Sequence, residues 1–537
     1  MWRTAPNLLG LILFKRLIIF LPVFIFFVLT VTHANSLSVK SKTLKNGARY
    51  ESSECWFNLT SFPSGFQNLS WASGLKIRRI ECGYLFTRKE QGKSFFQLPI
   101  VIIRNSLWQN SKKPILYIAG GPGSSSWLSQ KDLSDFWLPY IDDIDWQHDF
   151  VMFDTRGTGL SKPALHCEHF LENTLAIFSK NLQPEEEAKS YFNIAQNCHQ
   201  KMSKEQLAAI KQLGTQKSAN DIADLADLLN IESWHLYGTS YGTRLALEVE
   251  RHHPDKVASL ILDSVYPLEV DGEETLPGLY LDSLKRIIDA CANDSECSAH
   301  FPQLGKELQE LFKQLQKKPI TFTLSVNNKP VKYILTPARL FSVLFDAGYS
   351  IESIVVVPNA IHSLYLGVKE PIQFLIQWSL ELMRDNEFSN PVFMEVECNE
   401  NEIKNQRIHV ENIIKKYKNY PVLKRWQLAF FTEDICKSWG AKEVNKSFHQ
   451  ALHSDKPALI FAGKLDNVTP SKWGKLLSKD LTNSEYHEFK ASAHGVLFDV
   501  DCAKEIVRGF LNPEKQPSKN CHSKDIIKWE VPKLLNP

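Results

Sequence analysis

The sequence lacks features that mark several classes of protein. It has no internal repeat and no low-complexity tract, which argues against a solenoid or a disordered chain. Its 62 basic and 60 acidic residues nearly balance and no basic block dominates, so we expect no nucleic-acid partner. No cysteines form the C-x-x-C pair of a zinc site, and the glycine-rich segment 120–123 lacks the Lys-Ser/Thr ending of a phosphate-binding loop. We therefore expect neither a metal nor a cofactor.

What the sequence contains is typical of a large globular protein. Of its 537 residues, 43% are apolar, 11% aromatic and 23% charged, which is enough apolar material for a large core. The length fits two domains in series, or one catalytic fold that carries a large insertion.

The first 34 residues have the pattern of a secretory signal. Basic residues at positions 3, 15 and 16 precede an apolar run over residues 17–29, and the segment ends in Thr-His-Ala34. This pattern predicts cleavage after Ala34 and a secreted or periplasmic protein without stable membrane association afterwards. A retained membrane anchor is the alternative, but the run is shorter than the roughly 20 residues of a spanning helix.

Ten cysteines follow this segment, and an even number in an exported chain predicts disulfides. Pairing between sequence neighbours is the simplest arrangement, and it would join Cys291 to Cys297 and Cys398 to Cys436. The count alone leaves many other pairings open.

Short apolar runs predict the strands of a sheet. The runs at 114–119 and 150–153 are apolar throughout and end in glycine-rich turns, which suits strands buried on both faces. Strand-like segments at 234–237 and 258–262 alternate with helical patterns. This alternation predicts an α/β fold, with a mostly parallel sheet and helices on both faces.

The alternation stops near residue 268 and resumes near residue 451. Between them the pattern is largely helical. We therefore predict one sheet domain formed by residues 35–267 and 451–537, interrupted between its sixth and seventh strands by an inserted helical cap over residues 268–450. Two independent domains in series are the weaker alternative, because strand-like segments lie on both sides of the insertion.

The segment 238–242 reads Gly-Thr-Ser240-Tyr-Gly and matches the G-x-S-x-G nucleophile elbow of the α/β-hydrolase fold. The elbow is a sharp turn between strand and helix, and its neighbours must be small because the two backbones nearly touch. A predicted strand enters the motif and an amphipathic helix leaves it. We therefore predict that Ser240 is the nucleophile.

A serine nucleophile needs a base and an acid that orients the base, and in this fold they follow in the order serine, acid, histidine. Asp466 follows the predicted strand at 458–462, and His494 follows the strand-like segment 486–489. We predict that these two complete the triad. Asp263, after the strand at 258–262, is the alternative acid, and His487 is the alternative base.

The oxyanion hole requires two backbone N–H groups that point to the developing negative charge. Tyr241, directly after the nucleophile, should supply one of them. We expect the other from Gly120 and Gly121, where missing side chains would let a substrate carbonyl approach the backbone.

These motifs together resemble the proline iminopeptidase and tripeptidyl aminopeptidase family of α/β-hydrolase serine peptidases, especially its secreted branch. The resemblance rests on Gly-Gly-Pro-Gly at 120–123, Asp-Thr-Arg-Gly-Thr-Gly at 154–159, the elbow, Asp466-x-x-Thr-Pro and His494-Gly, in the family's order. It implies that the protein hydrolyses amide bonds near the free N-terminus of peptide substrates, through an acyl-enzyme.

Two positions depart from the family pattern. Ala119 replaces the histidine that often precedes Gly-Gly-Pro-Gly, and Thr155 replaces a glutamine, which favours the broader aminopeptidase or tripeptidyl branch over proline-specific cleavage. The segment 394–400 resembles the family's Cys-x-Glu segment and makes Glu400 a candidate for binding the substrate amine. Glu395 and Glu397 are weaker candidates.

Two other functions remain open at this point. A carboxylesterase would use the same triad, and a non-enzymatic binding protein could have kept a hydrolase scaffold. The second is disfavoured because no member of the triad is missing from the sequence. The sequence makes no prediction of the oligomeric state.

Overall fold

The computed structural model describes residues 40–57, 80–90, 92–105, 112–384, 387–401, 415, 432–440, 447–515 and 525–532. The predicted signal segment 1–34 and Cys521 lie outside these ranges. None of the helices in the described part of the chain is long and apolar enough to cross a membrane.

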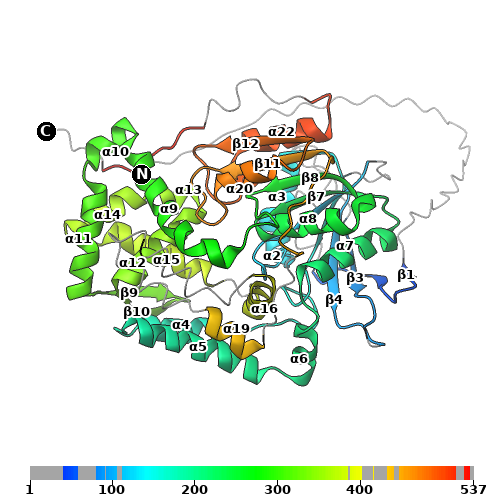
Figure 1. The fold of residues 1–537 in the computed structure, drawn as a ribbon, viewed down its shortest axis with the longest axis horizontal. Coiled ribbons are helices and arrows are strands. Elements are labelled where there is room, and N and C mark those ends of the chain that lie inside the picture. Colours follow the sequence, from blue (N-terminus) through cyan, green and yellow to red (C-terminus); the bar gives the residue numbers. More distant parts are fainter. Residues whose placement is uncertain are drawn as a thin grey trace, which may run out of the picture. The chain divides into compact units, whose positions relative to one another are not determined.

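Ten strands of the described residues form one sheet, in the order β1-β2-β3-β4-β6-β5-β7-β8-β11-β12 (Figure 1). The six strands from β6 to β12 in this order run parallel, and β1 to β4 are antiparallel. The mostly parallel sheet predicted from the sequence is confirmed. The strands are β1 Ser41–Thr43, β2 Arg49–Ser53, β3 Ile80–Phe86, β4 Gln97–Ile103, β5 Ile115–Ile118, β6 Phe150–Phe153, β7 Trp234–Thr239, β8 Val257–Asp263, β11 Ala458–Gly463 and β12 Ser484–Phe489.

The central strands are apolar throughout because both of their faces are covered. In β5, Leu116 and Ile118 belong to the core on one side of the sheet, whereas Ile115 and Tyr117 belong to the core on the other side. Successive side chains of a strand point to opposite faces, so a continuous apolar run is what a doubly covered strand requires.

Helices cover the two faces of the sheet. One core contains residues of α7 (Thr215–Leu229), α8 (Tyr241–His252) and α20 (Ser471–Leu477). The other contains residues of α3 (Leu138–Ile144), α21 (Val496–Asp499) and α22 (Asp501–Leu511). The amphipathic helices predicted after the strand-like segments therefore pack on the sheet that the same segments form.

The strands β1 and β2 were not predicted, so the insertion follows the eighth strand of the sequence rather than the sixth. β1 is the edge strand and β2 lies next to it, and both consist mainly of polar, partly exposed residues, so they lack the apolar pattern that identifies a buried strand. The antiparallel hairpin of β9 (Ile320–Val326) and β10 (Lys329–Leu335) inside the insertion was also missed.

The inserted segment has its own apolar core. The hairpin packs with the inserted helices (Figure 1). The helices are α9 Gly272–Ala292, α10 Ser295–His300, α11 Leu304–Lys317, α12 Pro337–Asp346, α13 Ile351–Ile354, α14 Val357–Tyr365, α15 Glu370–Leu382, α16 Asn390–Glu400 and α19 Thr432–Trp439.

Two segments from outside the insertion join this helical region. The helices α4 (Phe170–Phe178) and α5 (Pro184–Lys201) precede α6 (Lys204–Ile210) in the sequence, and they contact β10 and α19. Residues 525–532 also pack there, since the buried Trp529 lies in the same core and the Glu530 N–H donates to the Val355 carbonyl. The cap is therefore assembled from three parts of the chain.

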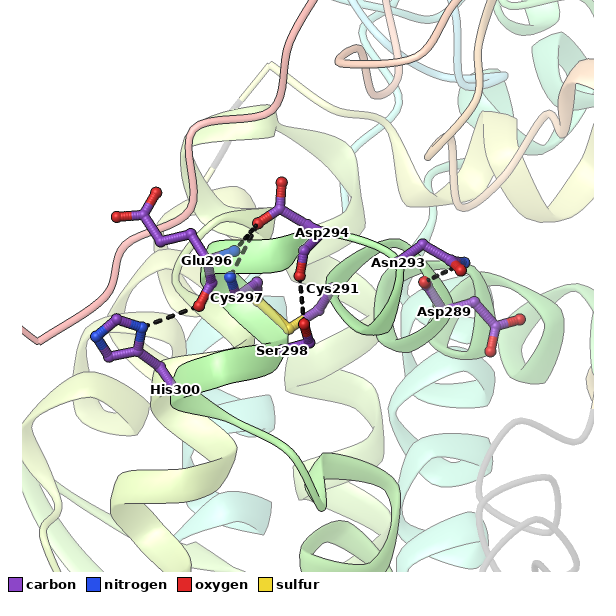
Figure 2. Close-up of a disulfide and its surroundings, with 8 residues drawn as sticks. All are labelled: Asp289, Cys291, Asn293, Asp294, Glu296, Cys297, Ser298 and His300. Atoms are coloured by element: carbon purple, nitrogen blue, oxygen red, sulfur yellow. Dashed lines mark hydrogen bonds between the residues drawn. A yellow bond between two sulfur atoms is a disulfide. The ribbon is translucent and has the colours of Figure 1, made fainter.

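The structure has disulfides between sequence neighbours, as the simplest pairing predicted. Bonds join Cys55 to Cys82, Cys167 to Cys198, Cys291 to Cys297 and Cys398 to Cys436, and Cys502 is also disulfide-bonded. The Cys291–Cys297 bond links α9 to α10 across a turn in which the Asp294 carboxylate caps the N-terminus of α10 (Figure 2).

Candidate active site

Ser240 lies between β7 and α8 in a strained turn. Its backbone has φ 59° and ψ −125°, a left-handed region that residues with a side chain rarely adopt. The flanking glycines explain how the turn is possible. A Cβ atom at Gly238 would lie 2.4 Å from the Gly242 carbonyl oxygen, and one at Gly242 would lie 2.1 Å from the Ile118 carbonyl oxygen. The chain therefore forms the elbow geometry that G-x-S-x-G requires.

The glycine-rich loop after β5 lies directly against Ser240. A Cβ atom at Gly120 would stand 3.0 Å from Ser240 Cβ and 3.6 Å from Ser240 Oγ. Gly121 has φ 108°, and a Cβ there would lie 2.5 Å from the Gly123 nitrogen. A side chain at Gly121 would collide with the backbone of its own loop, and one at Gly120 would be tightly confined against Ser240. Gly120 is therefore next to the predicted nucleophile, and Gly121 follows it in the same loop.

Asp466 and His494 form a hydrogen-bonded pair. The distance between His494 Nδ1 and Asp466 Oδ2 is 2.9 Å, and the aspartate is fully buried. The remaining acceptor sites of Asp466 are also used: Oδ1 accepts from the backbone N–H groups of Val468 and Thr469, and Oδ2 accepts from Thr469 Oγ1 at 2.7 Å. These bonds fix the carboxylate so that it can orient the imidazole ring.

The charges of the pair stabilise one another. Burial lowers the pKa of His494, but the charge of Asp466 and its hydrogen bond outweigh that effect, so the pKa is raised above the usual value of 6.5. Burial raises the pKa of Asp466, but the charge of His494 and the hydrogen bonds from His494 and Thr469 bring it below its usual value. The aspartate is thus an anion that favours a proton on the imidazole.

The end of β8 connects the elbow to the histidine loop. The Asp263 carbonyl accepts from the Ser240 N–H at 2.9 Å, and the Ser264 hydroxyl accepts from the Gly495 N–H at 2.8 Å. The Asp263 carboxylate accepts from the backbone N–H groups of Val496 and Leu497, at the start of α21. Asp263, the alternative acid, therefore holds the loop that carries His494.

His487, the alternative base, lies within β12 rather than after it. Its ring stacks on that of Phe461 in the neighbouring strand, with the ring centroids 5.6 Å apart. His494 instead follows the carboxyl end of the strand, where open α/β sheets bind their ligands.

The Asp-Thr-Arg-Gly-Thr-Gly motif has a structural role. Asp154 is fully buried and accepts from the backbone N–H groups of Ser126 and Leu160, which ties the loops after β5 and β6 together. Arg156 makes a two-pronged ion pair with Asp221 of α7, with distances of 2.6 and 2.8 Å. The motif thus supports the glycine-rich loop beside Ser240.

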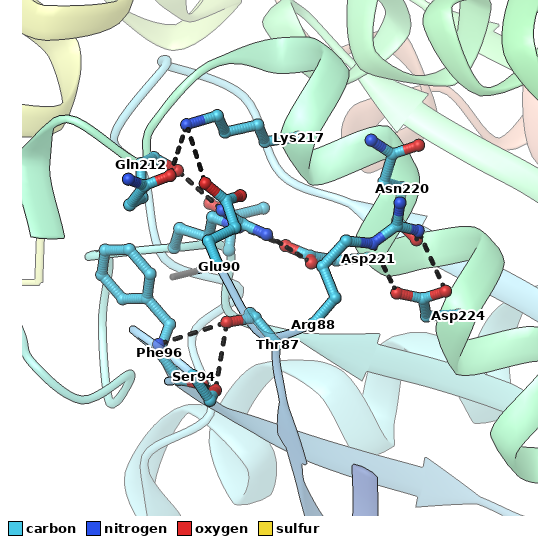
Figure 3. Close-up of polar contacts among 12 residues, drawn as sticks. Thr87, Arg88, Glu90, Ser94, Phe96, Gln212, Lys217, Asn220, Asp221 and Asp224 are labelled. Carbon is cyan, nitrogen blue, oxygen red and sulfur yellow. Dashed lines mark hydrogen bonds and ion pairs between the residues drawn. The ribbon is translucent and has the colours of Figure 1, made fainter. Parts of the chain in front are cut away.

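Besides Asp221, helix α7 has a second aspartate in an ion pair. Arg88 donates to both oxygens of Asp224, three residues after Asp221, at 3.0 Å each (Figure 3). Figure 3 also shows Lys217 of α7 close to Gln212 and Glu90. These charges fix α7 against the sheet, and the first residue of α7, Thr215, contacts Tyr241, the residue after Ser240.

Glu400, the candidate for amine binding, is at the end of α16 and is bound to Thr215. Its two oxygens accept from the Thr215 N–H and the Thr215 hydroxyl, each at 2.6 Å. Burial raises the pKa of Glu400 to about 7, although both hydrogen bonds from Thr215 oppose this shift. Thr215 Oγ1 also lies 2.5 Å from the hydroxyl of Tyr241.

The two weaker candidates lie on the same helix. Glu397 is buried and accepts from the Asn401 side chain at 2.7 Å. Glu395 is half-buried and lies near enough to Lys217 to raise the pKa of that lysine, which burial lowers overall.

Two residues of the cap contact the predicted triad, and sequence patterns did not identify them. Arg286 of α9 donates to the Asp466 carbonyl at 2.5 Å. The ring of Tyr349 meets that of His494 edge to face, with the centroids 5.4 Å apart. Thr469 and Thr215 were missed as well. Only the position of Thr469, three residues after Asp466 in Asp-x-x-Thr, gave a local signal for such a hydrogen bond.

Among the described residues, no group of three or more His, Cys, Asp or Glu side chains is arranged to hold a metal ion.

Comparison with known proteins supports the assignment of the fold. Residues 113–341 match the family model of the alpha/beta hydrolase fold, and residues 422–522 match that of the TAP-like proteins. A tripeptidyl aminopeptidase of Streptomyces lividans is 23% identical over 459 residues, which cover 80% of this chain and 81% of the relative. A proline iminopeptidase of Arabidopsis thaliana is 26% identical over 175 residues, or 32% of each chain. The chain therefore has the alpha/beta hydrolase fold, and these matches support its similarity to the tripeptidyl aminopeptidases and proline iminopeptidases.

Proposed function

We propose that the protein is a secreted serine exopeptidase that hydrolyses amide bonds near the free N-terminus of peptides. The observation that carries the proposal is the hydrogen-bonded pair of Asp466 and His494, which is tied through the end of β8 to the turn that carries Ser240. Relatives named tripeptidyl aminopeptidase and proline iminopeptidase support a peptide as the substrate.

In the proposed mechanism, His494 removes the proton of the Ser240 hydroxyl through its Nε2 atom while Oγ attacks the carbonyl carbon of the substrate. Asp466 holds the ring with its proton on Nδ1 and stabilises the imidazolium that forms. The N–H groups of Tyr241 and of Gly120 or Gly121 bind the oxygen that becomes negative. His494 then protonates the leaving amine, and a water molecule hydrolyses the acyl-enzyme by the reverse transfers.

Export is part of the proposal. The disulfides support it, because such bonds persist in oxidising compartments and are rare in the cytosol. The predicted signal at 1–34, with cleavage after Ala34, accounts for how the chain would reach such a compartment.

The role of Glu400 in binding the substrate amine stays a prediction. A carboxylate has about four lone-pair sites, and Thr215 uses two of those of Glu400. An ammonium would have to approach the remaining sites of a buried group.

The proposal is tested with a library of free peptides, the same peptides blocked at the N-terminus, and a p-nitrophenyl ester. We expect release of N-terminal fragments from the free peptides, little cleavage of the blocked ones, and a loss of about 10⁶-fold in Ser240→Ala, as in other serine hydrolases. Hydrolysis of the ester alone would indicate a carboxylesterase. No hydrolysis of any substrate would indicate a binding protein.

A further inference from the structure

A chain of hydrogen bonds connects the residue after the nucleophile to the end of α16. The Tyr241 hydroxyl lies 2.5 Å from Thr215 Oγ1, which lies 2.6 Å from Glu400 Oε2. When Glu400 is ionised, its carboxylate can only accept, so the Thr215 hydroxyl donates to Glu400 and the Thr215 oxygen is left to accept from Tyr241. In this state the hydrogen bonds of the chain all point from the tyrosine to the glutamate.

This chain is enclosed by protein. The exposed fractions are 6% for Tyr241, 0% for Thr215 and 9% for Glu400. Because water cannot easily replace the partners, loss of one of them would leave a buried polar group unpaired. Glu400 also accepts from the N–H of Thr215, the first residue of α7, where the helix dipole favours a negative charge. Glu400 is thus held by a backbone donor as well as by a side-chain donor of Thr215.

The other end of α16 holds the glycine-rich loop. The Ser389 N–H, directly before the helix, donates to the Gly123 carbonyl at 2.8 Å. A Cβ atom at Gly123 would lie 2.6 Å from the Ser389 carbonyl oxygen, so the two backbones are in close contact. Helix α16 therefore contacts the loop of Gly120 and Gly121 at its start and, through Thr215, Tyr241 at its end.

We infer that Thr215 and Glu400 are positioning residues that hold Tyr241, and that α16 sets the two donors of the oxyanion hole relative to each other. The inference rests on the proposed function. Its physical basis is that an oxyanion hole stabilises the transition state only when its N–H groups already point to the forming charge. A Tyr241 ring free to shift would move the backbone N–H at the start of α8.

The inference and the amine-binding prediction for Glu400 differ in their consequences. A residue that binds the substrate amine affects peptides and leaves a neutral ester unaffected. A residue that positions the oxyanion hole affects both substrates equally, and it affects kcat rather than KM.

The central experiment compares Thr215→Val, which removes the hydroxyl at nearly constant volume, with Thr215→Ser, which retains it. Thr174→Val is the matched control, because Thr174 is also buried and its hydroxyl donates within α4, to the Phe170 carbonyl. With a free peptide and a p-nitrophenyl ester, we expect Thr215→Val to lower kcat about 5- to 50-fold with KM within about twofold. This is less than the loss of about 10²–10³ for removal of a whole oxyanion donor. Thr215→Ser should retain most of the activity, and Thr174→Val should have the kcat and KM of the unaltered protein.

An alkyl trifluoromethyl ketone provides the second measurement, since its adduct with the serine places an oxyanion in the hole. Its affinity should fall in Thr215→Val by the same factor as kcat. Glu400→Gln should lower kcat for ester and peptide alike.

Equal activities and equal ketone affinities for Thr215→Val and Thr174→Val would overturn the inference. A loss confined to peptides in Glu400→Gln would overturn it for that residue. These outcomes are distinct from failure of the proposed function, in which the unaltered protein would hydrolyse neither substrate.

Discussion

The sheet and the cap hold the residues of the candidate site by different means. In the sheet, Ser240, Asp466 and His494 each follow the carboxyl end of a strand, and parallel pairing brings those ends to one edge. In the cap, Arg286, Tyr349 and Glu400 come from separate helices and loops, and each contacts a residue of the sheet domain.

This difference suggests that the residues at the strand ends carry out the reaction and that the residues of the cap position them. The sheet-end residues have neighbours along the chain that fix them, such as the glycines of the elbow and Thr469 beside Asp466. The cap residues depend on packing between distant segments. Changes in the sheet should therefore remove the reaction, whereas changes in the cap should tune it.

The largest effect after loss of the nucleophile should come from Asp466→Asn. The asparagine can still accept from Val468 and Thr469, so the fold should persist, but its amide would favour the wrong tautomer of His494. We expect kcat to fall about 10⁴-fold, as in other triads, with the melting temperature nearly unchanged. Asp143→Asn, on the exposed surface, is the control.

The pH profile of the residual activity gives a second measurement. His494 acts as a base only when neutral, so activity appears as the pH rises through its pKa, which lies above 6.5 in the unaltered protein. In Asp466→Asn the two contributions from Asp466 are lost, whereas burial, which lowers the pKa of His494, and the smaller opposing effect of the Asp263 charge remain, so the acidic limb should move to lower pH. An acidic limb at the same pH in both proteins, or a fall in kcat of less than tenfold, would argue against Asp466 as the orienting acid.

The same contrast explains how far the sequence could predict the structure. The central strands, the elbow and the order of Ser240, Asp466 and His494 depend on local patterns: apolar runs, glycines and strand ends. The neighbour pairing of the disulfides was also correct for the four bonds named above.

What the sequence could not predict depends on contacts between distant segments. The pairing of Thr215 with Glu400 spans 185 positions, and that of Arg286 with Asp466 spans 180. No periodicity encodes such pairs. The participation of α4, α5 and residues 525–532 in the cap was missed for the same reason, because local patterns identify helices but not their neighbours.

Removal of two disulfides of the cap should have smaller effects on kcat and on the free energy of unfolding, and these effects should differ between the two bonds. Cys398–Cys436 closes 38 positions and lies two residues from Glu400, whereas Cys291–Cys297 closes 6 (Figure 2). From chain entropy, replacing the first pair by serine should lower the free energy of unfolding by about 4 kcal/mol, and the second by about 2 kcal/mol. Chemical denaturation measures both. Only the first replacement should also lower kcat, because it loosens the end of α16. Equal changes in kcat would show that this end is held without the disulfide.

The central claim is that Ser240 is the nucleophile, and a fluorophosphonate probe tests it most directly. The probe reacts with a serine hydroxyl activated by a neighbouring base, and peptide mapping by mass spectrometry locates the adduct. We predict one equivalent of label, on Ser240, with loss of peptide hydrolysis in parallel, and no label in Ser240→Ala. An adduct on a different residue that abolishes activity, or full activity in Ser240→Ala, would contradict the account.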